Sequence, residues 1–358
     1  MALDAFDLRT MIAVLDQRKA TLTLYRSTFF RRQPQIHVSE TFAVDVRKGG
    51  VRIAPFVSPV REGQAVRAEG FTTYDLKPGY VKPKFTITPA DLQKRLPGES
   101  IFSARSTAER EQILVARRLG ELDDTLVNRE EVMMRDALLD GLIEIWEDVR
   151  GTLVKVREID FLRNAALTVT LGVGTWWTTV ATTILDNLQT WATLLRTHGN
   201  MGPDVCIMAP DVTAVVTRNT TILALLDNRR VEQGSIAPRE KMFGVDYVGQ
   251  LRAPGCYVEL WCDSRTYTNE AGVETAMMPA KNILLGSTQA QCEMHYGPIQ
   301  DLEAASDLGI AGNGMIPAQR FPKTWTEKDP SVRYVLLQSS PLPVPVNVDA
   351  FLRATVLA

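Results

Sequence analysis

The chain has 358 residues, of which 45% are hydrophobic and 23% are charged. These proportions are typical of a folded globular protein and exclude wholesale disorder. The net charge of −2 excludes a strongly basic nucleic-acid coat protein. The charge is uneven along the chain, because residues 1–100 carry a net charge of +6 and the remainder carries −8.

The cysteines and the longest apolar stretch indicate whether disulfides or a membrane span are expected. Four cysteines are present and none forms a C-x-x-C pair, so we expect free, buried or half-buried thiols. The first residues lack the pattern of a signal peptide. Residues 165–185 carry no charge and are long enough to span a membrane, but seven of them are threonine and a Trp pair lies in the middle. That composition favours strands and a loop, so no membrane partner is expected.

The N-terminal residues have apolar side chains at helical spacing between positions 8 and 15. The stretch YRSTFFRR follows, in which Phe29 and Phe30 stand beside Arg31 and Arg32. Aromatic side chains next to a basic pair on a terminal arm suggest docking onto another molecule. Docking onto the chain's own core is the alternative.

Residues 36–90 read almost entirely as extended chain, in strand-like pieces separated by turn signals such as Lys77-Pro78-Gly79. Prolines within or beside these pieces predict edge strands, because proline cannot donate a hydrogen bond to a ladder. The apolar side chains do not share one face, so a hairpin here is marginal in isolation. We expect it to lean on another chain or on the rest of this one.

Residues 103–140 predict one long helix, which would be a structural strut. Ser106 and Glu109 match a capping box, apolar residues follow three or four apart, and Gly141 is a plausible stop. The acidic pairs Asp123-Asp124 and Glu130-Glu131 are interpreted as a solvated face of this helix.

Beyond this helix the pattern alternates irregularly between strands and helices. Residues 142–160 predict a hairpin, 184–198 a helix and 204–209 a short strand, and Pro210 opens a further helix. Strands are also expected in 243–268, 273–286 and 331–340. Three alternating prolines after residue 340 predict an extended segment that cannot be a central strand. The mixture favours an α+β fold.

No local pattern indicates catalysis or cofactor binding. His37, His198 and His295 have no further ligands at metal-binding spacing, and neither a nucleophile elbow nor a Walker loop is present. The glycine clusters near residues 172 and 309 are interpreted as loops. We therefore expect no enzyme activity, no cofactor and no metal site.

Several segments together resemble the phage lambda major capsid protein family, also called major capsid protein E. The strongest lies at 56–99, where PGYVKPK is followed by a Thr/Pro pair and LQKRLPGE. YRSTFFRR resembles the N-terminal arm of the family, and residues 283–301 resemble its late strand and turn. Residues 320–358 resemble its C-terminal end. The blocks lie in the same order, whereas residues from about 160 to 240 match in pattern only.

The resemblance implies an α+β fold of the Hong Kong 97 type found in tailed-phage capsids. It implies an N-terminal arm at 1–38, an extended hairpin called the E-loop at 39–90, a peripheral domain with a long spine helix and a hairpin at 91–162, an axial domain at 163–310, and return strands of the peripheral domain at 311–358. In the family the E-loop lies across a neighbouring subunit.

The function implied is that of a major capsid protein of a tailed bacteriophage or prophage. Such subunits assemble with one another into pentamers and hexamers of an icosahedral shell that encloses double-stranded DNA without sequence specificity. The implied partners during assembly are a scaffold, a portal and a maturation protease, and a small decoration protein is expected on the shell. The implied location is the virion capsid, assembled in the bacterial host cytoplasm.

We expect the contacts between subunits to come from the arm and the E-loop. The candidate residues are Phe29, Phe30, Arg31, Arg61, Glu62, Gly63, Gln64, Tyr74, Tyr80, Lys82 and Lys84. The basic first hundred residues and the acidic remainder would provide complementary surfaces between neighbours. Because the family pattern starts close to Met1, no fused scaffold domain is expected before the arm.

Two other interpretations stay open at this point. One is an encapsulin-like nanocompartment of the same fold, which would enclose cargo protein in place of DNA. The other is an α+β enzyme whose site has no recognisable pattern; a ligand that raises the melting temperature would support it.

Overall fold

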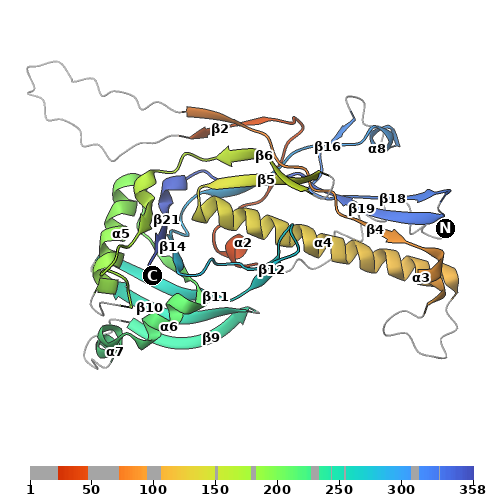
Figure 1. Cartoon of the computed structure of the whole chain (residues 1–358). Helices are drawn as coiled ribbons and strands as arrows, with labels where there is room; N and C mark the ends of the chain where they lie inside the picture. Colours follow the sequence, from red (N-terminus) through yellow and green to blue (C-terminus); the bar gives the residue numbers. More distant parts are fainter. Residues whose placement is uncertain are drawn as a thin grey trace, which may run out of the picture.

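The structure is a computed structural model, and it describes residues 23–46, 72–94, 106–149, 152–178, 183–226, 234–242, 244–253, 255–307, 314–329 and 331–358. Within these residues a large sheet with helices occupies one end of the molecule, and a long helix with smaller sheets extends away from it (Figure 1).

The large sheet has seven strands and contains most of the largest hydrophobic core. In spatial order they are β7 (Thr168–Thr170), β21 (Phe351–Thr355), β14 (Asn282–Gly286), β8 (Val205–Met208), β11 (Cys256–Asp263), β10 (Val245–Ala253) and β9 (Gly234–Met242). β8 is parallel to β11 and β21 is parallel to β7, while the other neighbours are antiparallel. β8 and β14 are buried along their whole length, as expected for strands covered on both faces.

β21 is the last strand of the segment 311–358, which was expected to supply return strands of the peripheral domain. It lies between β7 and β14 in the large sheet. Phe351 and Leu352 are adjacent in the chain and both are fully buried, at 1% and 0% exposure. A strand that buries successive side chains needs cover on both of its faces, which a position within the large sheet supplies.

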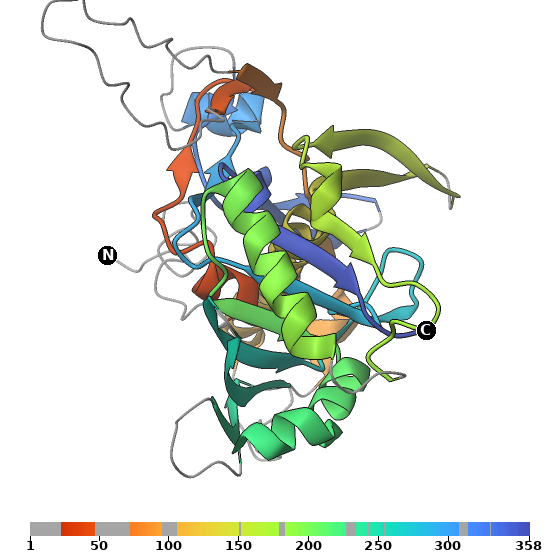
Figure 2. The same cartoon turned by 90° about the vertical axis from the view of Figure 1, so that its left-hand side faces the viewer.

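Among the described residues, three helices accompany the large sheet, namely α5 (Thr183–Gly199), α6 (Pro210–Arg218) and α7 (Thr220–Leu226). α5 crosses one face of the sheet, where it contacts β10 and β21 and buries Trp191 and Leu195 (Figure 2). Pro210 stands in the first turn of α6, where a backbone N–H would have no helical partner. The helices predicted at 184–198 and after Pro210 are confirmed.

The predicted strut is α4 (Thr107–Leu139), which at 33 residues is about 50 Å long. The capping box is present, since Glu109 N–H donates to Ser106 Oγ and Ser106 N–H donates to the Glu109 carboxylate. Gly141 follows the C-cap with a φ of +71°, a conformation that glycine adopts without a steric cost. The short helix α3 (Pro89–Gln93) packs against α4.

A three-stranded sheet lies along α4 (Figure 1), in the order β18 (Phe321–Glu327), β19 (Val332–Gln338) and β4 (Lys84–Ile87). Val335 and Leu337 point toward α4 and form a second core with Leu119 and Leu122. Because side chains alternate along a strand, Tyr334 is on the opposite side of this sheet.

A second three-stranded sheet consists of β1 (Gln35–Ile36), β15 (Cys292–Tyr296) and β20 (Pro341–Pro345), with β20 at an edge. Gly297 N–H donates to the Ser340 carbonyl and Val346 N–H donates to that of Gln291, so the even-numbered residues of this segment bond to β15. The three prolines alternate with them, which puts their missing N–H groups on the open edge. The prediction that this segment is no central strand is confirmed.

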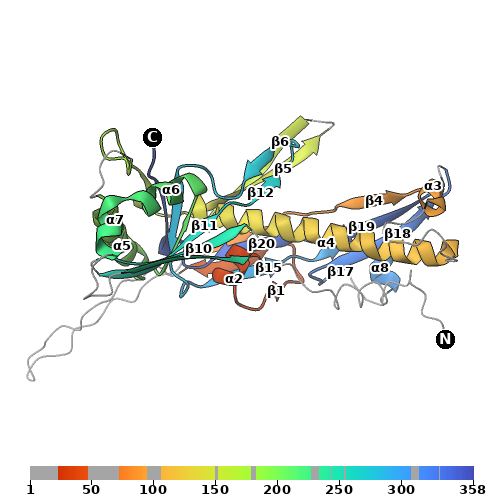
Figure 3. The ribbon, with the colours of Figure 1, turned by 90° about the horizontal axis from the view of Figure 1, so that it is seen from below.

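Two hairpins of the described residues extend from these sheets and α4. One is formed by β2 (Phe42–Val46) and β3 (Thr72–Leu76), and the other by β5 (Leu142–Val149) and β6 (Thr152–Asp160). Their roots meet in a third core, where Phe42 and Leu76 of one pack near Ile143 and Ile159 of the other. The β5–β6 hairpin projects away from α4 (Figure 3) and confirms the hairpin predicted at 142–160.

The remaining elements are α2 (Leu24–Thr28), η1 (Ala165–Leu167), β12 (Thr266–Thr268), β13 (Glu274–Ala276), β16 (Ile299–Gln300), α8 (Leu302–Asp307), β17 (Met315–Ile316) and η2 (Val348–Ala350). Among the helices of the described residues, none is long and apolar enough to cross a membrane. All four cysteines are free and buried, as predicted.

Candidate functional site

The structure places the predicted contact residues of the arm and those near β4 in different surroundings. Phe29 and Phe30 are each 3% exposed and lie in the main core, and the Phe29 ring meets that of Phe351 edge-on at 5.2 Å. The expectation that these rings contact another subunit is therefore wrong, and the alternative of docking onto the chain's own core holds. Arg31 remains exposed, with its guanidinium donating to the Ser27 carbonyl at 2.9 Å.

Tyr80, Lys82 and Lys84, in contrast, come together at the sheet beside α4. We call the side of the β18–β19–β4 sheet that is turned away from α4 the outer face. Lys84 Nζ lies 5.1 Å from the ring centroid of Tyr334, and the Trp325 ring lies 5.2 Å on the other side of that tyrosine. Aromatic rings with neighbouring ammonium groups form cation–π pairs, which leave the cation free to contact a partner as well.

The edge of the outer face is completed by the segment that leads into β4. Tyr80 OH donates to Gln338 Oε1 at 2.9 Å and accepts from Gln300 N–H at 3.1 Å, while Lys82 Nζ lies 4.3 Å from the Tyr80 ring. Burial raises the pKa of Tyr80 to about 12, so this phenol stays a hydrogen-bond donor at neutral pH. With 37% exposure for Tyr80 and 38% for Trp325, the outer face presents aromatic surface to solvent.

The other predicted contacts cannot be placed in the same way. Arg61, Glu62, Gly63 and Gln64 lie outside the described residues. Tyr74 belongs to β3, where its backbone is paired with that of Val44.

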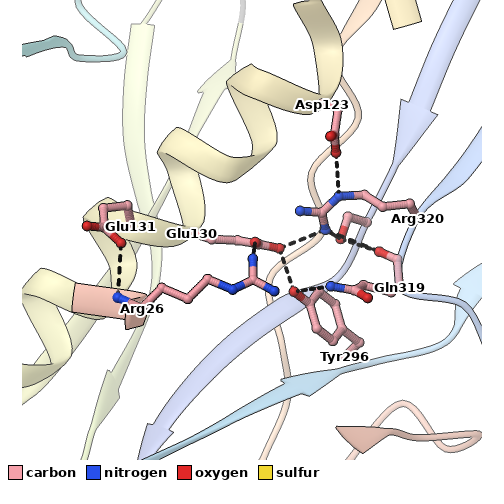
Figure 4. A network of polar contacts seen from close by, with 8 residues as sticks. Arg26, Asp123, Glu130, Glu131, Tyr296, Gln319 and Arg320 are labelled. Carbon is pink, nitrogen blue, oxygen red and sulfur yellow. Dashed lines mark hydrogen bonds and ion pairs between the residues drawn. The ribbon is translucent and has the colours of Figure 1, made fainter. Parts of the chain in front are cut away.

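A second candidate site, at which the N-terminal arm meets α4, was not found from the sequence. Glu131 accepts a hydrogen bond from the backbone N–H group of Tyr25 at 2.9 Å, at the start of α2. It accepts a second one from the backbone N–H group of Arg26 at 3.3 Å (Figure 4). Arg265 Nη2 donates to the same carboxylate at 3.2 Å, and its guanidinium also holds Asp263. One side chain of α4 thus fixes the arm against the long helix.

Glu130 forms the other half of this arm–helix junction. Its carboxylate accepts from Arg320 Nη1 at 2.7 Å and Tyr296 OH at 2.9 Å, and from Arg26 Nη1 at 3.4 Å. Arg320 also donates to Asp123 at 3.1 Å (Figure 4). The junction therefore joins α4 to the arm, to β15 and to the segment before β18.

Glu130 and Glu131 are 1% and 2% exposed, so the interpretation of this pair as a solvated helix face is wrong. The sequence does contain a signal for Glu130: it lies four residues after Leu126 and three before Met133, on the apolar stripe of the helix. A carboxylate on a buried stripe requires buried cations or N–H donors, which the arm and Arg320 provide.

The electrostatics of the junction follow from this burial. Burial raises the pKa of Glu131, opposed by Arg265 and by the N–H groups of Tyr25 and Arg26. Burial acts to lower the pKa of Arg320, but the facing Glu130 outweighs it and the net direction is upward. The acids and bases of the junction are thus matched with one another. Within the described residues, no group of three or more His, Cys, Asp or Glu side chains is arranged to hold a metal ion.

Comparisons with known proteins agree with one another along the whole chain. A family model described as phage major capsid protein E matches residues 7–356. The major capsid protein of Enterobacteria phage P21 is 28% identical over 355 residues, which cover 97% of each chain. That of Escherichia phage lambda is 26% identical over 347 residues, 95% of this chain and 96% of the relative.

Solved structures show the likeness of the fold. A prophage capsid protein from Escherichia coli CFT073 has a TM-score of 0.71 at 19% identity, with full coverage of both chains. A phage-related protein from Bordetella bronchiseptica RB50 has a TM-score of 0.51 at 10% identity, covering 96% of this chain and 94% of the other.

Proposed function

Because the chain belongs to the phage major capsid protein E family, we propose that it builds a closed icosahedral shell of pentamers and hexamers around double-stranded DNA, using the outer face and the β2–β3 hairpin as contacts between subunits. Membership of this family and the Hong Kong 97-type α+β fold confirm the two main predictions from the sequence. The protein is a major capsid protein of a phage or prophage, and such proteins assemble into shells.

The single observation that carries the proposal is the β2–β3 hairpin. Phe42, Leu76 and Val44 pack into the third core on one face of the ribbon, but Ala43, Thr73 and Asp75, which lie on the other face, are exposed. A two-stranded ribbon with one open face is marginal in isolation. Contact with a neighbouring subunit would supply the missing cover, as the E-loop does in the family.

The outer face supports the same role from a different part of the chain. Its exposed Tyr and Trp rings belong to the residue types that are enriched at protein interfaces, and its ammonium groups would be complementary to acidic side chains of a neighbour. The positive balance of residues 1–100 against the acidic remainder provides a further attraction between copies. In this scheme α4 and the small sheets form the peripheral domain, and the large sheet, now including β21, forms the axial domain.

The proposal extends to partners by family resemblance. We expect assembly with a scaffold, a portal and a maturation protease in the bacterial cytoplasm, and a small decoration protein that adds to exposed strand edges of the arm and the E-loop. The chain would act without catalysis and without a cofactor. The curated relatives described above are phage capsid proteins, which favours enclosed DNA over the encapsulated cargo of the alternative interpretation.

The test is negative-stain electron microscopy and light scattering of the full chain, expressed alone and with its neighbouring genes. We expect closed shells, or rings of five and six subunits that close when scaffold is present. Replacement of residues 48–70 by a short glycine linker should abolish shells while leaving the subunit folded, because the buried root of the hairpin is kept. Normal shells from this variant would refute the role of the hairpin.

The outer face is tested by the double substitution Lys82→Glu with Lys84→Glu. We expect the subunit to keep its circular dichroism spectrum and melting temperature but to lose shell formation. Lys94→Glu is the matched control, since Lys94 is also exposed and lies at the end of α3. Shells from the double variant at the wild-type yield would refute the proposed contact.

A further inference from the structure

Two histidines that are 258 residues apart in sequence form a hydrogen-bonded pair. His37 Nε2 lies 2.8 Å from His295 Nδ1, and the two rings are inclined by 19°. The Phe42 ring covers both imidazoles, with centroid distances of 4.3 Å to His37 and 4.8 Å to His295 and near-parallel planes. His295 is buried at 5% exposure, while His37 is half-buried.

The pair lies where three parts of the fold meet. His37 follows β1, which pairs with β15, and His295 is a residue of β15 itself. Phe42 is the first residue of β2, so its ring carries the root of the β2–β3 hairpin. The short segment from His37 to Phe42 joins the arm to this hairpin along the chain. The three rings therefore help to set the orientation of the hairpin, together with the third core at its root.

The charged groups around the pair are few within the described residues. On β15, Glu293 Oε2 lies 3.8 Å from His295 Nε2. Glu293 is itself occupied by Arg32 (2.7 Å) and by Gln35 (2.8 Å) from the arm. At the hairpin root Lys77 is bound to Glu40 at 3.0 Å. β20, the other neighbour of β15, carries no charged side chain.

We infer that His37, His295 and Phe42 form a latch that holds the root of the β2–β3 hairpin against β15 while the imidazoles are neutral, and releases it when both become protonated. This inference goes beyond the proposed function, because it concerns a conformational change within a single subunit.

The physical basis is the number of protons between the two nitrogens. When both rings are neutral, one nitrogen donates a proton and the other accepts it, which the 2.8 Å separation permits. A single added proton preserves this hydrogen bond. A second added proton places two N–H groups and two positive charges face to face, with no acceptor between them, and the pair must separate.

Burial supports the direction of this switch. Burial lowers the pKa of His295 to about 4, with a further contribution from His37, and burial also lowers the pKa of His37. His295 Nε2 has no hydrogen-bond partner in the described part of the chain, and the nearby Glu293 carboxylate raises the pKa of His295 by less than burial and His37 lower it. The closed latch therefore binds protons more weakly than the released one. The closed latch is favoured at neutral pH, and its population falls as the pH drops below about 6.5.

The experiment measures hydrogen exchange of the hairpin in the full-length, unassembled subunit at pH 7 and at pH 5. Exchange rates of peptides that cover 42–46 and 72–76 are corrected for the intrinsic effect of pH. We expect a rise of about 20-fold at pH 5, from the difference between the ordinary and the lowered pKa of His295. Three histidine signals in a selectively labelled sample would report the protonation of each ring directly.

The decisive variant combines His37→Gln with His295→Asn, whose amide groups can occupy the places of Nε2 and Nδ1 without titrating. We expect its hairpin to exchange at the same corrected rate at both pH values. His198→Gln is the matched control and should keep the wild-type response. A wild-type hairpin that ignores pH would overturn the inference, and so would an acid response that persists in the double variant. Because the subunit is unassembled, neither result depends on shell formation.

Discussion

The arm–helix junction and the outer face contain similar types of residue but differ in how far these residues are buried. Both combine aromatic rings with cations beside α4, but Glu130 at the junction is 1% exposed and Trp325 on the outer face is 38% exposed. At the junction each charge has a partner within the chain, as Glu130 has Arg320 and Tyr296. On the outer face the ammonium groups lie against aromatic rings and remain open to solvent.

The difference shows how burial decides what a charged residue can do. A buried charge must be paired with an opposite charge inside the subunit. If one partner is removed, the other charge remains buried and unpaired, and its desolvation is no longer compensated. An exposed charge contributes little to stability but stays available for another molecule. Mutations at the junction should therefore change folding, whereas mutations on the outer face should change assembly.

The largest expected effect is that of Glu130→Ala. It leaves Arg320 and Tyr296 without their common acceptor in a buried site, so we expect a loss of about 3–5 kcal/mol in the free energy of unfolding. Chemical denaturation of the unassembled subunit, followed by circular dichroism, measures it. Glu121→Ala is the control on the same helix, because Glu121 pairs with Arg118 at the surface. A loss below 1 kcal/mol for Glu130→Ala would contradict the importance of the junction.

A medium effect is expected from Tyr296→Phe. The Tyr296 hydroxyl donates to Glu130 at 2.9 Å and accepts from Gln319 at 2.9 Å, so its removal should cost about 1–2 kcal/mol. Tyr334→Phe makes the same chemical change on the outer face and should leave the free energy of unfolding nearly unchanged. Equal losses for the two variants would remove the distinction between the two regions.

The smallest effect concerns pH at the border of the outer face, where Asp301 accepts from Lys323 Nζ at 2.8 Å. Burial acts to raise the pKa of Asp301, but Lys323 outweighs it and the net direction is downward. A lowered pKa stabilises the fold above the ordinary value, and this gain is lost as the pH falls through the lowered one. We expect Asp301→Asn to cost up to about 1 kcal/mol at pH 7 and progressively less as the pH falls below the ordinary pKa of an aspartate. A cost that stays constant over this range would exclude ionisation as its cause.

Elements with strong local signals were predictable from the sequence. The capping box at Ser106, the glycine at 141 and the stripe of apolar residues between them define α4 without any distant contact. The prolines after residue 340 exclude a central strand for a reason that lies in each residue itself, and β20 is indeed at an edge. Family resemblance supplied the overall architecture, which local patterns alone do not specify.

The features that were not predicted depend on residues far apart in the chain. Local pattern cannot show that Glu131 meets Tyr25 and Arg26, more than 100 residues away, or that His37 meets His295. The burial of Phe29 beside Phe351 also depends on residues far apart in the chain. The hydrophobic effect favours burial of an aromatic pair against any apolar surface, so the sequence does not show which surface covers it. The outer face was found in part, through Tyr80, Lys82 and Lys84, while Trp325 and Tyr334 reach it only through strand pairing.

The position of β21 has a consequence for synthesis of the chain on the ribosome. The large sheet cannot close until the segment near residue 355 has emerged, because that segment lies inside the sheet and not at its border. A chain that stops earlier leaves β14 and β7 each with an unpaired edge, and open edges invite aggregation. Completion of the sheet can therefore act as a check on chain length, so that a prematurely terminated subunit is not ready to join its neighbours.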